Sequence, residues 1–447
     1  MGTDLTPEVL EKIGKAFGTW VKSNSGSTVV VGRDNRASSL AFQESLMLGL
    51  RSTGCNVLDI GLSTTPVMNF TVLEMDLDGG ISITGSHNPL EFNGIKFSGS
   101  KGYTLTENDI QDIRNSIELN DFLVGHGEVS LWDPKPRYFA KLEELCHPQK
   151  SMRVVIDCGN GVASVYAPEV MHRLGHNTIE LYCDLDSTFP HHLPNPEIED
   201  NVRDLRNHVV NNAADLGIAF DGDCDRLGIV DEKGKFYQGD YTIILLSRDL
   251  LARHPGAKIL VDIKCSQNVL DDITRHGGVP VLWKTGYTFI RRKMREENLL
   301  LAGEESGHMF FGENYYQLDD GLLAACRVLQ ILSASELPLS EQFADLPQLH
   351  ATPLIQVPMA DAVKSRVVEE VQRELVRSDQ VNKIIDIDGV RASFEKGWAL
   401  VRASNTSPNL TLRFEASSLD RLKTIEQFVF NVLVRVSPVK INDWRVN

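Results

Sequence analysis

The fold class follows from one stretch, VVVGRDNRASSLAFQESLMLGLRSTGCNVLDI, at residues 29–60. It opens with a β-branched run, Val29 to Val31, which Gly32 closes. Residues 39–51 then repeat leucine and methionine at helical spacing, and a second strand-like run follows at residues 57–60. A strand, a helix and a strand in this order predict a parallel βαβ unit.

The same order of elements recurs along the chain. Strand-like runs at residues 154–156 and 259–263 precede helical patterns at residues 168–174 and 268–275. This predicts α/β domains with mostly parallel sheets. The last hundred residues alternate like strands around 398–401 and 410–414 before one helix at 419–434, which predicts a smaller α+β domain. Turn residues between the patterns predict domains at residues 1–133, 134–236, 237–347 and 348–447.

The bulk composition excludes several classes of protein. A formal net charge of −16 argues against a nucleic-acid binder, which needs a positive face. No apolar run reaches the ~18 residues of a membrane helix. The seven cysteines are scattered without a CxxC pair, as is typical of reduced thiols. We therefore expect a cytoplasmic protein that binds neither nucleic acid nor membrane.

Ligands of parallel sheets bind beyond the carboxyl ends of the strands, and polar loops follow several of the predicted strands. The loop TGSHNP at residues 84–89 presents Ser86 without the GxSxG elbow of a hydrolase. His87 and Lys96, with the nearby asparagines, supply donors that suit a phosphorylated Ser86. An ordinary capped polar turn remains the alternative interpretation of this loop.

The loop DGDCDR at residues 221–226 alternates Asp221, Asp223 and Asp225. Three such carboxylates repel one another unless a hard cation binds them, and Mg²⁺ is the natural candidate. An EF-hand fails because Arg226 stands where glycine is required; a solvated acidic turn is the other alternative. Magnesium completes its shell with phosphate oxygens, so a phosphoryl group on Ser86 would be a further metal ligand. Arg226 and Lys96 could neutralise that group.

Two later loops suit a phosphosugar. GEESGH at residues 303–308 places Glu304, Ser306 and His308 at alternate positions, where they could hold sugar hydroxyls. RASNTSP at residues 402–408 offers a guanidinium, hydroxyls and an amide for a phosphate dianion. The alternatives are a polar strand end and an ordinary hairpin turn. The expected phosphate ligands are Arg402, Ser404, Asn405 and Thr406.

Taken together and in this order, TGSHNP, DGDCDR, DIKC, GEESGH and RASNTSPNLTLRFEA resemble the α-D-phosphohexomutase superfamily. The resemblance spans the chain and is greatest to the bacterial phosphomannomutase/phosphoglucomutase group. It implies three similar α/β domains and a smaller α+β domain around a central cleft. It also implies a phosphoserine at Ser86, metal aspartates at 221, 223 and 225, and sugar contacts from Glu304 and Ser306. Further implied substrate contacts are Lys264, His308 and the loop at residues 402–406.

The implied reaction interconverts hexose 1-phosphate and hexose 6-phosphate. Phosphoserine donates to the free end of the sugar, the hexose 1,6-bisphosphate turns round, and Ser86 takes back the other phosphate. That bisphosphate is also the expected activator, and Lys96 and His308 are candidate proton carriers. The loops resemble mannose and glucose mutases more than phosphoglucosamine mutases, which stay an alternative. We expect a monomer or weak homo-oligomer.

Two departures from the family pattern bear on activity. Relatives usually carry an upstream segment like FREYDIRG with an active-site arginine, whereas this sequence opens MGTDLTPEV. Its absence would remove a cation near Ser86 and expose a sheet edge. Tyr287 in KTGYTFI replaces a histidine, so a contact there with the substrate would lack charge at neutral pH. An impaired phosphosugar-binding protein and a magnesium phosphatase are therefore further alternatives.

Overall fold

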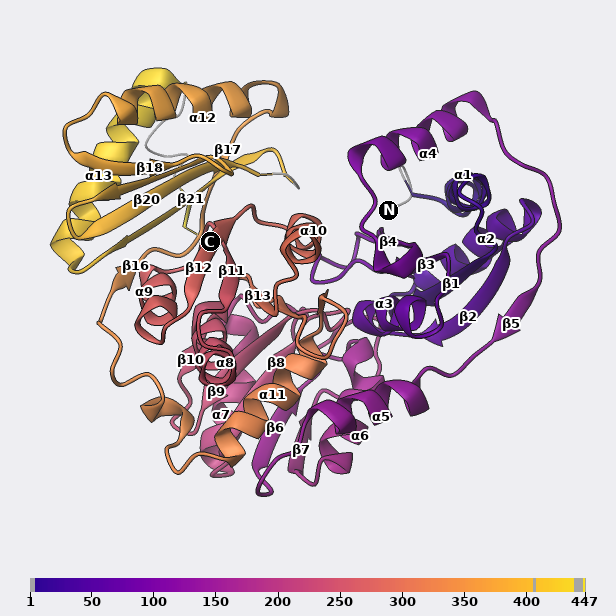
Figure 1. The fold of residues 1–447 in the computed structure, drawn as a ribbon, viewed down its shortest axis with the longest axis horizontal. Coiled ribbons are helices and arrows are strands. Elements are labelled where there is room, and N and C mark those ends of the chain that lie inside the picture. The colour runs from indigo at the N-terminus through magenta and orange to yellow at the C-terminus, as the bar shows by residue number, and fades with distance from the viewer. Residues whose placement is uncertain (1–4, 405–406, 438–444, 447) are drawn as a thin grey trace.

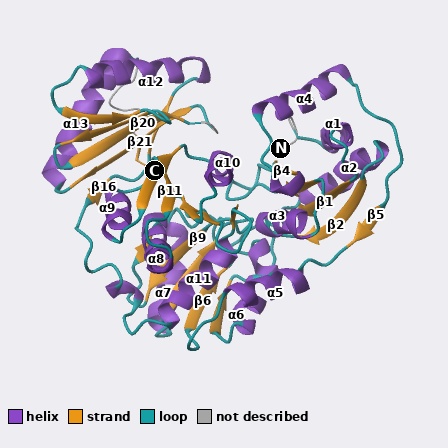
Figure 2. Cartoon of the chain, in the orientation of Figure 1, coloured by secondary structure: helices purple, strands orange, loops and turns teal. Residues whose placement is uncertain are grey.

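A computed structural model describes residues 5–404, 407–437 and 445–446. The chain forms four domains, each built on its own sheet, which follow one another around an arc (Figure 1). The first and last domains form the two ends of the arc, and the second and third join them. Helices pack against every sheet, and those of the fourth domain share one core with its sheet (Figure 2).

The first sheet has the strand order β4-β3-β1-β2-β5. Strands β1, β2, β3 and β5 run parallel, and β4 closes the sheet as an antiparallel partner of β3. The helices α1 and α2 pack so closely that a Cβ on Gly14 would lie 2.2 Å from the carbonyl oxygen of Leu46. The elements are α1 (Pro7–Ser23), β1 (Thr28–Arg33), α2 (Ser39–Ser52), β2 (Asn56–Leu62), α3 (Thr65–Glu74), β3 (Gly79–Ile83), β4 (Ile95–Gly99), α4 (Glu107–Leu119) and β5 (Val129–Leu131).

The second domain repeats this plan. In its sheet, β10-β9-β8-β6-β7, three parallel strands are followed by an antiparallel strand, β9 beside β8, as β4 lies beside β3 in the first sheet. The loop between β8 and β9 therefore occupies the same place as the loop between β3 and β4 in the first domain. The elements are α5 (Lys135–Leu145), β6 (Arg153–Asp157), α6 (Ala167–Arg173), β7 (Asn177–Leu181), α7 (Arg203–Asn211), β8 (Leu216–Phe220), β9 (Leu227–Asp231) and β10 (Phe236–Tyr237).

The third domain has the plan once more, with the order β12-β11-β13-β14-β15 and an antiparallel β14 beside β13. The GEESGH loop joins β13 to β14, the position that TGSHNP and DGDCDR hold in the other two domains. The elements are α8 (Gly239–Arg253), β11 (Lys258–Asp262), α9 (Gln267–Arg275), β12 (Val279–Trp283), α10 (Tyr287–Glu297), β13 (Leu301–Gly303), β14 (Met309–Phe311), β15 (Leu318–Asp319) and α11 (Gly321–Ser333).

The fourth domain is a fully antiparallel sheet whose main path runs β18-β19-β20-β21-β17-β22. It carries two helices, whereas the sequence patterns predicted one. The missed helix, α12, has no side-chain cap at its N-terminal residue Ala360, so a start signal was lacking. The elements are β16 (His350–Ala351), β17 (Ile355–Pro358), α12 (Asp361–Val376), β18 (Val381–Ile385), β19 (Val390–Phe394), β20 (Gly397–Ala403), β21 (Asn409–Ala416), α13 (Leu419–Val436) and β22 (Arg445–Val446).

The apolar cores show how the domains are joined. The largest cluster of buried side chains is continuous through the second and third domains and takes in Val67 and Phe70 of α3. The fourth domain has a separate core. It meets the third domain through a small apolar cluster of Ile263, Trp398 and Leu400 and through buried polar groups. One of these is Arg391, which donates to the carbonyl oxygens of Ile263 and Cys265 at 2.7 Å each.

The architecture confirms the predicted fold class, with mixed, mostly parallel sheets in three domains and a smaller C-terminal domain. In the described part of the chain, no helix is both long enough and apolar enough to cross a bilayer.

Candidate active site

The loop after β3 holds Ser86 in the left-handed backbone conformation, with φ of 48°. Such a conformation is uncommon outside glycine and points to a loop shaped by its surroundings. Ser86 is 8% exposed, and its hydroxyl donates to Asp221 Oδ2 at 2.8 Å. Since Ser86 belongs to the first domain and Asp221 to the second, this contact joins two of the predicted loops across a domain boundary.

The three aspartates of the loop between β8 and β9 form a cluster that fits a divalent metal ion. Asp221, Asp223 and Asp225 are buried, and each offers an oxygen within 4.8 Å of the others. Among the described residues, no donor reaches the buried Oδ1 atoms of Asp223 and Asp225. Burial and the two neighbouring carboxylates raise the pKa of Asp221 well above its usual value. Buried acceptors without donors and mutual repulsion are what a bound cation would relieve.

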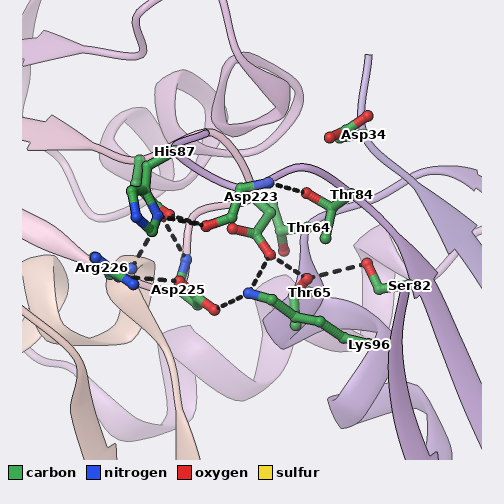
Figure 3. A network of polar contacts seen from close by, with 12 residues as sticks. Asp34, Thr64, Thr65, Ser82, Thr84, His87, Lys96, Asp223, Asp225 and Arg226 are labelled. Atoms are coloured by element: carbon green, nitrogen blue, oxygen red, sulfur yellow. Dashed lines mark hydrogen bonds and ion pairs between the residues drawn. The ribbon is translucent and has the colours of Figure 1, made fainter. Parts of the chain in front are cut away.

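Lys96 of β4 is the cation that approaches this cluster most closely (Figure 3). Its Nζ lies 2.7 Å from Asp223 Oδ2 and 2.5 Å from Asp225 Oδ2. Burial opposes its charge, but these carboxylates outweigh burial and hold the pKa of Lys96 well above the usual value. Lys96 is therefore a fixed positive charge, and carrying a proton to and from a substrate would require it to lose that charge.

Thr65 at the start of α3 was missed by the sequence analysis, yet it touches the aspartate loop directly. Its hydroxyl donates to Asp223 Oδ2 at 2.5 Å and lies 3.0 Å from the Ser82 hydroxyl (Figure 3). Its backbone N–H also donates to the carbonyl oxygen of Asp223. The signal was slight, because a threonine before proline at a helix start looks like ordinary capping chemistry.

Arg226 and His308 lie side by side although they come from different domains. Arg226 Nε is 2.8 Å from His308 Nε2, and Arg226 also pairs with Glu197 at 2.8 Å. His308 Nδ1 faces Asp319 Oδ2 at 3.0 Å, a partner that sequence patterns did not reveal. Accepting from Arg226 requires Nε2 to be unprotonated, with the proton on Nδ1.

The electrostatics of His308 oppose that neutral state. Burial disfavours a charged ring, but the carboxylates of Asp225 and Asp319 outweigh both burial and the repulsion from Arg226 and raise the pKa of His308 to about 9. A proton on Nε2 would break the contact with Arg226. The ring therefore has two competing states, which differ by one proton at the atom nearest Arg226.

His87 lies on the other side of the serine, with Nδ1 3.2 Å from Ser86 Oγ. The charge of Arg226, with burial and Lys96, lowers the pKa of His87 to about 2. Its ring is therefore neutral, with one nitrogen that donates a hydrogen bond and one that accepts, and it adds no positive charge to the site.

The predicted sugar-binding loop is buried between the second and third domains. Glu304 accepts from the Gly286 N–H at 2.5 Å, and Ser306 donates to Glu304 at 3.4 Å. Lys264 Nζ lies 3.2 Å from Glu305 and 3.5 Å from Asp262. Glu304 connects this group to the phosphoserine side, since its Oε2 lies 4.0 Å from His308 Nε2.

The predicted phosphate loop begins at the end of β20. Arg402 pairs with Asp388 at 2.9 Å, and Asp388 also accepts from the Thr285 N–H of the third domain at 3.1 Å. Ser404 is buried, and its hydroxyl accepts from the Ser407 N–H at 3.2 Å. The two other predicted phosphate ligands, Asn405 and Thr406, lie outside the described residues.

Tyr287 begins α10 close to the metal side of the site. Lys96 Nζ lies 5.8 Å from the centre of its ring. Burial raises the pKa of the Tyr287 hydroxyl, so this side chain is neutral. The histidine expected from the family pattern is thus replaced by an aromatic face beside a fixed cation.

Four family models match consecutive parts of the chain, and each describes one domain of phosphoglucomutase/phosphomannomutase. The α/β/α domains I, II and III match residues 1–123, 136–234 and 238–350, and the C-terminal domain matches residues 354–432. The chain belongs to the phosphoglucomutase/phosphomannomutase family.

Individual members of this family resemble the chain along almost its whole length. The phosphomannomutase/phosphoglucomutase of Pseudomonas aeruginosa is 41% identical over 428 residues, covering 95% of this chain and 92% of its own. A phosphoglucomutase of Neisseria meningitidis is 36% identical over 440 residues, covering 98% and 95%. A crystal structure of a family protein from Burkholderia thailandensis superposes with a TM-score of 0.92 at 34% identity, covering 98% and 95%.

The predicted superfamily is thereby confirmed, as is the prediction of a hexose phosphate mutase over a mere phosphosugar-binding protein. Membership of this family and the aspartate cluster together indicate a divalent metal ion.

Proposed function

We propose that this phosphoglucomutase/phosphomannomutase family member interconverts hexose 1-phosphates and hexose 6-phosphates through a phosphoryl group carried on Ser86. The observation that carries the proposal is the 2.8 Å contact between the Ser86 hydroxyl and Asp221. It places the candidate nucleophile at the edge of a buried acidic cluster that Lys96 already contacts. A phosphoryl group on Ser86 would lie between fixed positive charge and the atoms that hold a metal.

The metal that best fits is Mg²⁺, because every candidate ligand in the cluster is an oxygen. When bound, it would neutralise charge on the phosphoryl oxygens. Lys96 orients two of the aspartates and adds its own charge, which its high pKa keeps in place. Among the predicted proton carriers this disfavours Lys96, whereas His308 has a neutral state, the one that faces Arg226, in which Nε2 can accept a proton.

In the proposed first half-reaction, the bond between Ser86 Oγ and phosphorus breaks as a sugar hydroxyl forms a new bond to that phosphorus. The hydroxyl proton passes to Nε2 of the neutral His308 ring once Arg226 moves off that atom, and a proton from solvent returns to Ser86 Oγ as its bond to phosphorus breaks. The second half-reaction reverses these steps at the other phosphate of the hexose 1,6-bisphosphate, which also serves as activator. Glu304 and Ser306 would hold the sugar hydroxyls. Lys264, Arg402, Ser404, Asn405, Thr406 and the neutral Tyr287 would hold the rest of the substrate.

Intact-mass measurement tests the role of Ser86. The protein incubated with glucose 1,6-bisphosphate and Mg²⁺ should gain one phosphoryl group, and Ser86→Ala should gain none. Ser98→Ala is a matched control, since Ser98 is another buried serine of the first domain but lies in β4, outside the loop. Phosphorylation of Ser86→Ala, or none of the wild type, would contradict the proposal.

Coupled assays separate the possible reactions. Equal use of mannose 1-phosphate and glucose 1-phosphate would match the names of the relatives. Preference for glucosamine 1-phosphate would overturn the assigned sugar, and steady release of inorganic phosphate would indicate a phosphatase.

We further propose domain boundaries after residues 133, 236 and 347, a cytoplasmic location, and a monomer or weak homo-oligomer. The gaps between the family matches support the boundaries after residues 133 and 236, whereas the third match extends to residue 350, three residues past the boundary proposed there. The free cysteines support the cytoplasmic location. Limited proteolysis and light scattering test the boundaries and the oligomeric state.

A further inference from the structure

One buried arginine holds the loop that carries Ser86. Arg36 follows β1 and is 3% exposed. Its Nη2 donates to the carbonyl oxygens of Ser86 at 2.8 Å and Asn88 at 2.6 Å. Its Nη1 donates to those of Pro89 at 2.9 Å and Phe92 at 3.0 Å. A single guanidinium thus binds four carbonyl oxygens within seven residues of the loop.

A second residue, Asp34, holds both the arginine and the loop. Its Oδ2 accepts from the Gly85 N–H at 3.0 Å and lies 3.3 Å from Arg36 Nε. Its Oδ1 accepts from the Arg36 N–H at 3.0 Å and from the Ser39 hydroxyl at 2.5 Å. The Arg36–Asp34 ion pair therefore binds both kinds of backbone group in the loop: Arg36 binds carbonyl oxygens, and Asp34 binds an N–H group.

Hydrogen bonds, and not apolar packing, keep the shape of this loop, among them one from the Ser86 N–H to the Thr84 hydroxyl at 2.8 Å. Its apex is exposed, with Phe92 57% and Leu90 39% accessible, so apolar burial contributes little there. Ser86 nevertheless keeps a left-handed backbone with φ of 48°. Such a conformation costs on the order of 1 kcal/mol or more for a residue with a side chain, and it persists only where neighbours impose it.

The lack of space beside Gly85 shows that the guanidinium packs directly against the loop backbone. A Cβ on Gly85 would lie 2.4 Å from Arg36 Nε and 2.8 Å from the carbonyl oxygen of Phe92. From the other side, the ring of Phe189 in the second domain lies 5.5 Å from the Arg36 guanidinium carbon. Arg36 is therefore enclosed between the phosphoserine loop and the domain that carries the aspartates.

We propose that Arg36, oriented by Asp34, is the positioning residue of the phosphoryl-carrying loop: it fixes the backbone at Ser86 so that the hydroxyl meets Asp221. Among the described residues, the guanidinium of Arg36 makes its hydrogen bonds to the loop carbonyl oxygens and not to Asp221, Asp223 or Asp225, so it acts through the loop backbone. This inference rests on the proposed role of Ser86. The two Nη atoms of the rigid fork donate to four carbonyl oxygens, while Nε lies 3.3 Å from the Asp34 carboxylate as an ion pair. The three donors of a lysine cannot make four such hydrogen bonds.

The test compares Arg36→Lys, which keeps the charge, with Gly85→Ala, which keeps the arginine but displaces it. Leu46→Ala is the stability control, since Leu46 is a buried core residue of the same domain away from the loop. For both loop variants we expect kcat about 100-fold lower, because small misplacements of reacting groups cost rates of this order. The KM for glucose 1-phosphate should change little, and transfer of phosphate from glucose 1,6-bisphosphate to Ser86 should slow in parallel.

Hydrogen exchange of the loop amides, measured without substrate, separates positioning from general destabilisation. Exchange in residues 85–92 should accelerate in Arg36→Lys and Gly85→Ala but not in Leu46→Ala. Wild-type turnover by Arg36→Lys would overturn the inference, as would loop exchange equal to that of Leu46→Ala. If the wild-type enzyme showed no mutase activity, the proposed function would fail, while the exchange result would still decide whether Arg36 holds the loop.

Discussion

The contact between Thr65 and Asp223 offers a sharp test of how the first domain supports the metal cluster. Thr65→Val removes one hydroxyl and keeps the shape of the side chain. That hydroxyl donates to Asp223 Oδ2 at 2.5 Å, and Lys96 approaches the same oxygen at 2.7 Å. Thr71→Val is a matched control on the same helix, because the Thr71 hydroxyl donates only to the Val67 carbonyl oxygen, at 2.8 Å.

The two variants should differ in both stability and metal binding. Loss of a hydrogen bond to a charged group costs about 1.5–3 kcal/mol, and loss of a neutral one costs about 1 kcal/mol. Thr65→Val should therefore be destabilised by roughly 1 kcal/mol more than Thr71→Val. A residue that orients a metal ligand contributes about 10- to 100-fold to metal affinity, so Thr65→Val should weaken Mg²⁺ binding by that order.

Urea unfolding and calorimetric titration with Mg²⁺ measure these two effects. The variants are compared on the same unfolding transition, without added metal, so that binding does not contribute to stability. Equal stability and equal Mg²⁺ affinity in Thr65→Val and Thr71→Val would refute the idea that Thr65 orients Asp223.

Three further predictions concern other parts of the molecule. Asp221→Asn should weaken Mg²⁺ binding about 100-fold or more in the same titration, because it removes a charged candidate ligand. Burial raises the pKa of Asp320 to about 6. The protonated carboxyl therefore contributes fully to the free energy of unfolding below its unfolded pKa, and this contribution is lost as the pH rises through 6. The free energy of unfolding should fall by about 1 kcal/mol between about pH 5 and about pH 7.5. In urea unfolding, Asp320→Asn should lack this pH dependence. Gly14→Ala should lower the melting temperature, since overlap with Leu46 costs about 1–3 kcal/mol and outweighs the ~1 kcal/mol that alanine gains in a helix.

The sequence predicted the fold well wherever local pattern and tertiary environment agree. The run at residues 28–33 is a strand because its β-branched residues are buried on both sheet faces, as the parallel neighbours require. Helix α12 was missed because its first turn carries no capping side chain, so its boundary depends on packing against the sheet of the fourth domain.

Within the site, the sequence determined the residue types and the loops that carry them. Ser86, Asp221 and Glu304 stand after strands in three separate domains, and repeated strand order places all three loops at equivalent hairpins. The sequence could thus identify the loops that carry reactive side chains, but it could not show which of these side chains contact one another.

Only the tertiary structure decided the partners. Three hydrogen bonds of the site join residues that belong to different elements: Thr65 to Asp223, His308 to Asp319, and Arg36 to the carbonyl oxygen of Ser86. Each depends on how those elements pack against each other. The charge states follow the same rule. Lys96 is locked as a cation and His87 is kept neutral because of groups brought close by folding, and Coulomb interactions depend on distance in space rather than on separation in sequence.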